Sequence, residues 1–279
     1  MTIQELLESA TERSRSAKSE ATPWDARLLL AHVVGHTNPL ALPPGGEVSE
    51  SVLGRFEELW SRRLTGTPVQ HLVGEWDFFG RPFKVDERGL VPRPETEVLV
   101  LQAIGAAPRA RRILDLGTGS GILAITLLKE LPAARVLALD ASVEALALAQ
   151  ENARRHDVLP RLMLAGSDWL TAYAGPRFDL VVSNPPYLAR SEARSLSKTV
   201  ADHDPALALY GGDDGLESIR CLLEAVPRVI LPGAPFLFEI GFGQVRDVER
   251  EVRRHPEWRL DTISTDLSGI PRVTRLRRT

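Results

Sequence analysis

Five residues near the middle of the chain, Ser183-Asn184-Pro185-Pro186-Tyr187, join a rigid backbone to polar groups that could handle a planar amide. Two consecutive prolines cannot continue a strand's hydrogen-bond ladder, so they fix a stiff loop where the preceding apolar run ends. The side-chain oxygen of Asn184 and the carbonyl of Pro185 could each accept one hydrogen from an NH2 group, with the Tyr187 ring stacked behind it. Two such acceptors could draw the delocalised lone pair of that nitrogen toward an electrophile. A merely structural Pro-Pro turn is the alternative.

A glycine-rich turn lies upstream, in the stretch DLGTGSG at 115–121. It follows the strand-like run RRILDL and opens the helical run ILAITLLKEL, so the glycines would let backbone approach a ligand that side chains would block. The candidate contacts are Gly117, Thr118, Gly119, Ser120 and Gly121. A tight strand-to-helix turn without a ligand is the other interpretation.

Acidic and aromatic residues end the next two strand-like runs. Asp140 could accept hydrogen bonds from both hydroxyls of a ribose, and it could equally cap the helix that follows. Asp168 could accept from an adenine amino group and Trp169 could cover the ring, although Trp169 could also be a core residue. A nicotinamide dinucleotide and S-adenosylmethionine both carry such a ribose, so these residues alone leave the choice open.

The elements that must position these residues alternate between short apolar strands and amphipathic helices after Pro94. This alternation predicts a Rossmann-like α/β fold, with a mostly parallel sheet covered by helices on both faces. The last two strand-like runs, WRLDTIST and PRVTRLRR, flank the turn DLSGIP and predict an antiparallel edge. Residues 1–73 have helical periodicity and predict a small helical domain. A hairpin-like connector at 74–92 leads to the sheet domain at 93–279.

The motifs together resemble the HemK/PrmC family, the methyltransferases that modify the glutamine of the Gly-Gly-Gln tripeptide in class 1 peptide chain release factors. The resemblance covers nearly the whole chain and rests on these stretches: GEWDFFG (74–80), VPRPETE (91–97), DLGTGSG (115–121), Asp140, SDW (167–169), SNPPY (183–187) and DPALALYGGDDG (204–215).

The resemblance implies a class I methyltransferase that takes a methyl group from S-adenosyl-L-methionine and places it on the side-chain N5 of that glutamine. It implies cofactor contacts from Gly117 through Gly121, Asp140, Trp169 and Asn184. It also implies that Asn184, Pro185, Pro186 and Tyr187 hold the substrate, and that the helical domain recognises the release factor.

Composition narrows the other possibilities. With 34 basic against 37 acidic residues, the chain lacks the basic excess of a typical nucleic-acid or membrane-surface binder, and no apolar run has the length of a membrane span. We therefore expect a cytoplasmic protein. The lone Cys221 reads as a small core residue. His32 and His36 lie one helical turn apart without a third ligand, so we expect no metal.

Two rival functions remain. An adenine-N6 nucleic-acid methyltransferase could use the same Asn-Pro-Pro-Tyr geometry, because adenine also presents a planar NH2 group. The chain offers no extra target-recognition segment for it. A non-catalytic scaffold would have no need of an intact glycine loop together with Asp140 and Asn184.

Overall fold

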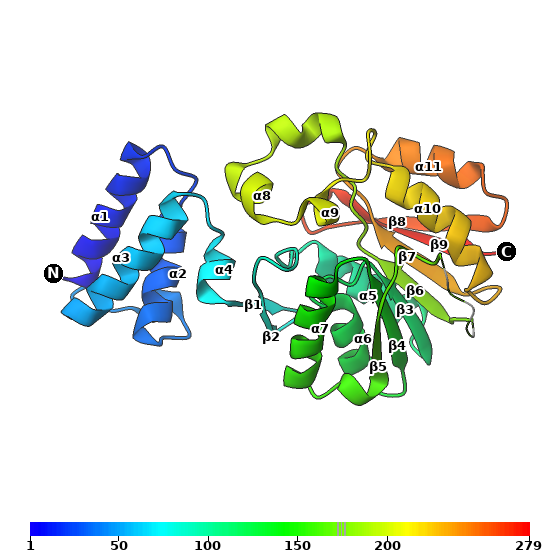
Figure 1. Cartoon of the computed structure of the whole chain (residues 1–279), viewed down its shortest axis with the longest axis horizontal. Helices are drawn as coiled ribbons and strands as arrows, with labels where there is room; N and C mark the ends of the chain where they lie inside the picture. Colours follow the sequence, from blue (N-terminus) through cyan, green and yellow to red (C-terminus); the bar gives the residue numbers. More distant parts are fainter. Residues whose placement is uncertain (172, 174, 176) are drawn as a thin grey trace. The chain divides into compact units, whose positions relative to one another are not determined.

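The computed structural model describes residues 1–171, 173, 175 and 177–279, and these form two compact units (Figure 1). The first unit comprises Met1–Glu75 together with Ser195–Asp204, and the second comprises Trp76–Arg194 and Pro205–Thr279. Within the described ranges, no helix combines the length and the apolar character that crossing a bilayer requires.

The first unit is built from helices around a small apolar core. They are α1 (Ile3–Ser16), α2 (Pro23–Val34), η1 (Pro39–Ala41), α3 (Glu50–Leu64), α4 (Val69–Val73) and α8 (Lys198–His203). Thr2 and Thr22 start α1 and α2 with reciprocal capping boxes, which satisfy backbone N–H groups that the helix itself leaves free. The rings of Phe56 and Trp60 stack with centroids 6.0 Å apart and are fully buried. The helical pattern of the first seventy residues thus reflects a real core.

One segment of this unit comes from far along the sequence. The carboxylate of Glu20 accepts hydrogen bonds from the backbone N–H groups of Lys198 (2.7 Å) and Thr199 (3.1 Å) at the start of α8. The buried guanidinium of Arg63, paired with Asp25 at 3.0 Å, also reaches the Thr199 hydroxyl at 3.4 Å. Side chains of the first seventy residues therefore hold the segment 195–204. The sequence did not predict that this segment belongs to the helical unit.

Seven strands of the described residues form the sheet of the second unit, in the order β5-β4-β3-β6-β7-β9-β8. Their bounds are β3 (Arg112–Leu116), β4 (Arg135–Asp140), β5 (Leu162–Gly166), β6 (Leu180–Ser183), β7 (Pro235–Glu239), β8 (Trp258–Thr265) and β9 (Pro271–Arg278). The first five in this order run parallel, and β9 and β8 are antiparallel, which confirms the expected fold class. β1 (Glu75–Phe78) and β2 (Arg81–Lys84) form a separate two-stranded sheet where a hairpin was expected.

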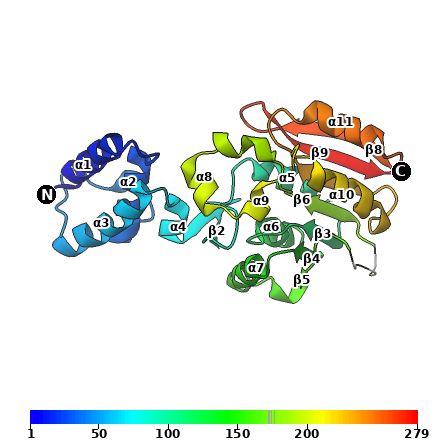
Figure 2. The ribbon, with the colours of Figure 1, turned by 45° about the horizontal axis from the view of Figure 1, so that its top comes forward.

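Helices cover both faces of the sheet, and Figure 2 shows α6 and α7 on the side opposite to α10 and α11. The helices of this unit are α5 (Thr96–Ala106), α6 (Ile122–Glu130), α7 (Val143–Arg155), α9 (Ala206–Leu209), α10 (Glu217–Ala225) and α11 (Val245–Arg253), with short 3-10 turns η2 (Leu159–Arg161), η3 (Arg190–Ser195) and η4 (Val226–Arg228). Two apolar clusters fill the layers, one beneath α5 and α6 and one beneath α10 and α11. The strand order reverses between β3 and β6, and ligands of such sheets bind where it does so.

The prediction for Cys221 was wrong. Its side chain is exposed, because α10 buries Ser218, Ile219 and Leu222 on the face toward the sheet. An apolar sequence context did not reveal which face of the helix Cys221 occupies.

Candidate active site

The glycine loop connects the end of β3 to the start of α6. The N–H groups of Gly117 and Thr118 donate to the carbonyl of Leu139 on the neighbouring strand, at 2.9 and 3.0 Å. Gly117, Gly119 and Gly121 all have positive φ, between 56° and 84°, a region that L side chains rarely adopt. A side chain at Gly121 would also press on Ala149 at 3.1 Å. The loop therefore requires glycine at these positions, and its residues Gly117 and Gly119 line a cavity.

Asp140 lies at the end of β4, beside this loop. Its carboxylate accepts from the backbone N–H groups of Gly119 at 2.8 Å and Ser142 at 2.9 Å. The side chain that caps α7 belongs to Ser142, which accepts from the N–H of Ala145, so the alternative that Asp140 is that cap is wrong. Asp140 thus closes the loop and presents its carboxylate to the cavity.

Asp115, at the end of β3, stabilises the loop from beneath. It is fully buried and accepts a hydrogen bond from the Thr118 hydroxyl at 2.6 Å. Burial raises the pKa of Asp115 to about 7, because little water reaches the charged form. The sequence alone assigned Asp115 no role of its own within the motif. Its hydrogen bond with Thr118 shows that it holds the glycine loop.

The segment after β5 supplies a further wall. Ser167, Asp168 and Trp169 all line the cavity. Trp169 has φ +51°, which is unusual for a bulky residue, and its ring packs partly against the core beneath α10. Trp169 is therefore both a neighbour of the core and a wall of the cavity, and its contact with an adenine ring stays a prediction.

The segment after β6 places Asn184 and Pro186 in the wall of the same cavity, whereas Pro185 is buried behind them. The Asn184 Nδ2 donates to the hydroxyl of Thr96 at 3.3 Å. The Tyr187 hydroxyl donates to Glu239 at 3.4 Å, and burial raises the pKa of Tyr187. Of the four candidate amide-binding residues, Asn184 and Pro186 thus line the cavity, whereas Pro185 and Tyr187 do not.

A glycine-rich loop at 211–215 supports this segment from outside. A Cβ at Gly211 would collide with the carbonyl oxygen of Pro186, and a Cβ at Gly215 would lie 2.5 Å from that of Tyr187. Gln244, just before α11, donates to the Tyr187 carbonyl at 2.9 Å and to that of Gly215 at 3.2 Å. The GGDDG motif therefore lies close enough to fix the backbone of the amide-binding segment.

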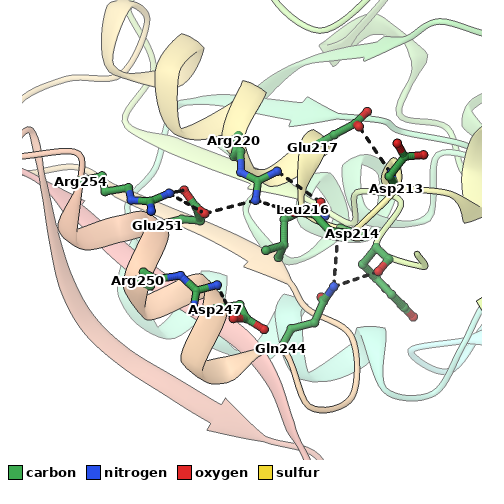
Figure 3. Close-up of polar contacts among 12 residues, drawn as sticks. Asp213, Asp214, Leu216, Glu217, Arg220, Gln244, Asp247, Arg250, Glu251 and Arg254 are labelled. Atoms are coloured by element: carbon green, nitrogen blue, oxygen red, sulfur yellow. Dashed lines mark hydrogen bonds and ion pairs between the residues drawn. The ribbon is translucent and has the colours of Figure 1, made fainter. Parts of the chain in front are cut away.

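Figure 3 shows how this loop is tied to the two helices behind it. Asp214 pairs with Arg220 of α10 at 2.6 Å, and Arg220 reaches Glu251 of α11 at 3.2 Å. Burial of a carboxylate normally raises its pKa, yet the pKa values of Asp214 and Glu251 are lowered because Arg220 bonds to both. Because these ion pairs are partly exposed, we expect them to orient the loop without adding much to the stability of the fold.

These elements enclose one cavity of about 210 Å³. Its lining includes candidates that the sequence offered: Gly117, Thr118, Gly119, Ser120, Asp140, Asp168, Trp169, Asn184 and Pro186. The candidates Gly121, Pro185 and Tyr187 do not line it, whereas the stretch 88–93 and residues of the segment after Asp204 do and were not expected. The lining residues are Arg88, Gly89, Leu90, Val91, Pro92, Arg93, Thr96, Leu116, Gly117, Thr118, Gly119, Ser120, Ile122, Leu123, Leu139, Asp140, Ala141, Ser142, Ala145, Ser167, Asp168, Trp169, Asn184, Pro186, Pro205, Leu207, Ala208, Tyr210 and Ser218. A carboxylate beside a glycine loop that carries no bulky side chains, with an aromatic wall, suits a nucleoside with a charged tail.

Glu239 was also missed. It ends the otherwise apolar β7 at the same edge as Asn184, and it is 1% exposed. The sequence did offer a signal for Glu239, because a lone carboxylate at the carboxyl end of an apolar strand indicates a functional residue.

Two family models match the chain. Residues 5–74 match the PrmC N-terminal domain, and residues 95–207 match the methyltransferase small domain. The release factor glutamine methyltransferase of Cereibacter sphaeroides is 40% identical over 99% of this chain and 99% of its own. That of Koribacter versatilis is 38% identical over 98% of this chain and 97% of its own.

Solved structures resemble the chain in fold. A methyltransferase from Pyrococcus furiosus has a TM-score of 0.54 at 18% identity, over 72% of this chain and 90% of its own. Fold and site together define an S-adenosylmethionine-dependent methyltransferase with a Rossmann-like sheet. The chain belongs to the PrmC family, the release factor glutamine methyltransferases.

Proposed function

We propose that this enzyme methylates the side-chain N5 of the glutamine in the Gly-Gly-Gln motif of class 1 peptide chain release factors. The observation that carries the proposal is the position of Asn184, which lines the same cavity as the glycine loop and Asp140. A planar amide can therefore meet the cofactor at this point. Identities of 38 and 40% to release factor glutamine methyltransferases, over 98 and 99% of the chain, support the same substrate.

Asn184 and Pro185 position the reacting nitrogen. The Asn184 oxygen and the Pro185 carbonyl each accept one hydrogen of the substrate NH2 group, and Tyr187 stacks against the plane of the amide. Because both acceptors are fixed, they favour the geometry in which the nitrogen lone pair leaves conjugation. Gln244 and the GGDDG loop hold the backbone behind them.

The cofactor site is assigned to the other side of the cavity. S-adenosylmethionine, when bound, supplies an electrophilic methyl group on a sulfonium. Asp140 would accept hydrogen bonds from the ribose hydroxyls, and the loop from Gly117 to Gly121 would hold the tail. Asp168 would accept a hydrogen bond from the adenine amino group, and Trp169 would cover the ring.

The helical unit is assigned to partner recognition. Among the described residues, those that line the cavity all belong to the second unit, so we give the helical unit a task other than lining the cofactor site. It exposes Trp24 (47%) and Leu40 (71%), large apolar side chains suited to a protein partner. A glutamine on a small loop offers little binding area, so remote contacts must supply affinity. Because release factors act on ribosomes, we place the enzyme in the cytoplasm.

Methyl transfer to three acceptors tests the proposal: a whole release factor, the same factor with its Gly-Gly-Gln glutamine replaced by alanine, and duplex DNA containing adenine. Mass spectrometry of the factor should find one added methyl group on that glutamine and none on the alanine variant. Methylation of DNA in place of the factor would overturn the proposed substrate in favour of an adenine amino group.

A further inference from the structure

A buried row of polar side chains leads from Asn184 into the core of the second unit. The Asn184 Nδ2 lies 3.3 Å from the hydroxyl of Thr96, the first residue of α5. That hydroxyl lies 2.7 Å from Glu239 Oε2 at the end of β7. Thr96 and Glu239 are 0% and 1% exposed, so neither exchanges its partner freely with water. The row therefore connects three elements that are remote in sequence and ends on one carboxylate.

The direction of the hydrogen bonds in this row is set by the number of protons. A threonine hydroxyl carries a single proton, and an ionised carboxylate can only accept. With Glu239 ionised, Thr96 donates to it and must accept from Asn184. The NH2 end of the Asn184 carboxamide then faces Thr96, and its oxygen faces the opposite way.

We propose that Glu239 is a positioning residue that, as a carboxylate, acts through Thr96 to turn the Asn184 oxygen toward the substrate amide. The inference rests on the proposed function, since it assumes that this oxygen receives a hydrogen of the substrate NH2 group. A reversed carboxamide would present its own NH2 group there, so that two donors would meet. Glu239 thereby selects the productive orientation without touching the substrate.

Protonation of Glu239 would reverse the row. A protonated carboxyl can donate to Thr96, which frees the Thr96 proton for the Asn184 oxygen. Burial raises the pKa of Glu239 to about 7; the Thr96 hydrogen bond and the charge of Arg272 on β9 oppose the rise, and Glu95 before α5 adds to it. The hydroxyl of Tyr187 also donates to Glu239, and Arg272 is itself paired with Asp266. The switch between orientations thus falls near neutral pH.

Three substitutions test the proposal. Thr96→Val removes the hydroxyl at nearly constant shape, Thr96→Ser keeps the hydroxyl, and Glu239→Gln removes the charge at constant size. Methyl transfer to whole release factor should show kcat lowered roughly ten- to hundredfold in Thr96→Val, with KM and cofactor Kd within about threefold of wild type. Thr96→Ser should retain most of the wild-type rate. A wild-type rate in Thr96→Val would overturn the proposal.

The pH profile separates positioning from simple support of the fold. The wild-type kcat should rise as pH increases through about 7, because the ionised form of Glu239 is the competent one. Glu239→Gln should flatten this rise while the protein stays folded by circular dichroism. A persisting rise in Glu239→Gln would assign the titration to another group and contradict the proposal.

An NMR measurement tests the row without any substrate. The carboxamide proton signals of Asn184 should shift with a midpoint near pH 7 in the wild-type protein, and this titration should disappear in Thr96→Val and Glu239→Gln. Signals that do not change with pH would overturn the proposal. If the wild type titrates in this way but leaves release factor unmethylated, the proposed substrate fails and the orientation of Asn184 stands.

Discussion

The proposed active site has a cofactor half and an amide half, and different kinds of contact hold the two. On the cofactor half, the loop from Gly117 to Gly121 offers backbone groups, and Asp140 is anchored by two backbone N–H donors. On the amide half, Asn184 depends on a row of side chains from α5 and β7. If one of the two hydrogen bonds to Asp140 is lost, the other still holds the carboxylate. In the row from Asn184 through Thr96 to Glu239, the loss of any one hydrogen bond separates Asn184 from Glu239. The cofactor half should therefore tolerate single changes better than the amide half.

The largest expected effect is that of Asn184→Ala. The variant loses a fixed acceptor at the reacting nitrogen, so kcat should fall on the order of a hundredfold or more. Cofactor affinity, measured by calorimetry, should change little because the glycine loop and Asp140 are untouched. Near-normal turnover would contradict the role given to the amide half.

Asp140→Ala should act on the cofactor half instead. Loss of a charge-assisted partner for the ribose should weaken cofactor binding by about ten- to a hundredfold, and kcat at saturating cofactor should stay close to wild type. Asp140→Asn keeps the size of the side chain and one acceptor oxygen, so its cofactor Kd should lie between those of the wild type and Asp140→Ala. An unchanged cofactor Kd in a folded alanine variant would rule out the ribose assignment.

Gly211→Ala tests the support of the amide half from outside. The added Cβ would collide with the Pro186 carbonyl, so the amide-binding segment must shift, and kcat should fall roughly tenfold. Gly105→Ala is the matched control, because nothing lies within 4 Å of a Cβ there and alanine favours a helix. Equal rates for the two variants would mean that the GGDDG loop does not position the segment.

The smallest effect is expected outside both halves, at Trp24. Trp24→Ala should raise KM for whole release factor about fivefold and leave a short Gly-Gly-Gln peptide unaffected, since the peptide lacks remote contacts. Leu101→Ala is the control, an exposed apolar residue on α5 of the second unit (57% exposed). A larger effect in the control than in Trp24→Ala would assign partner binding to the second unit.

The two halves also differ in how far the sequence predicts them. The glycine loop, Asp140 and Trp169 follow strands in order, so local turn chemistry and the rule for sheet edges were enough to bring them to one cavity. Thr96 and Glu239 read as parts of a helix start and an apolar strand, and only the pairing of distant elements makes them neighbours of Asn184. The periodicity of apolar residues predicts which face of a helix or strand is buried. It does not predict that Thr96 and Glu239, which are 143 residues apart, form a hydrogen bond.

The passage of residues 195–204 through the helical unit has a consequence for recombination between family members. The chain leaves the second unit at Ser195 and returns at Pro205, whose neighbours Leu207 and Ala208 line the cavity. A chimera that exchanged only residues 1–73 would part Glu20 and Arg63 of one parent from Lys198 and Thr199 of the other. The helical unit is thus encoded by two separate stretches of the gene, and a chimera that keeps these contacts has to exchange both stretches together.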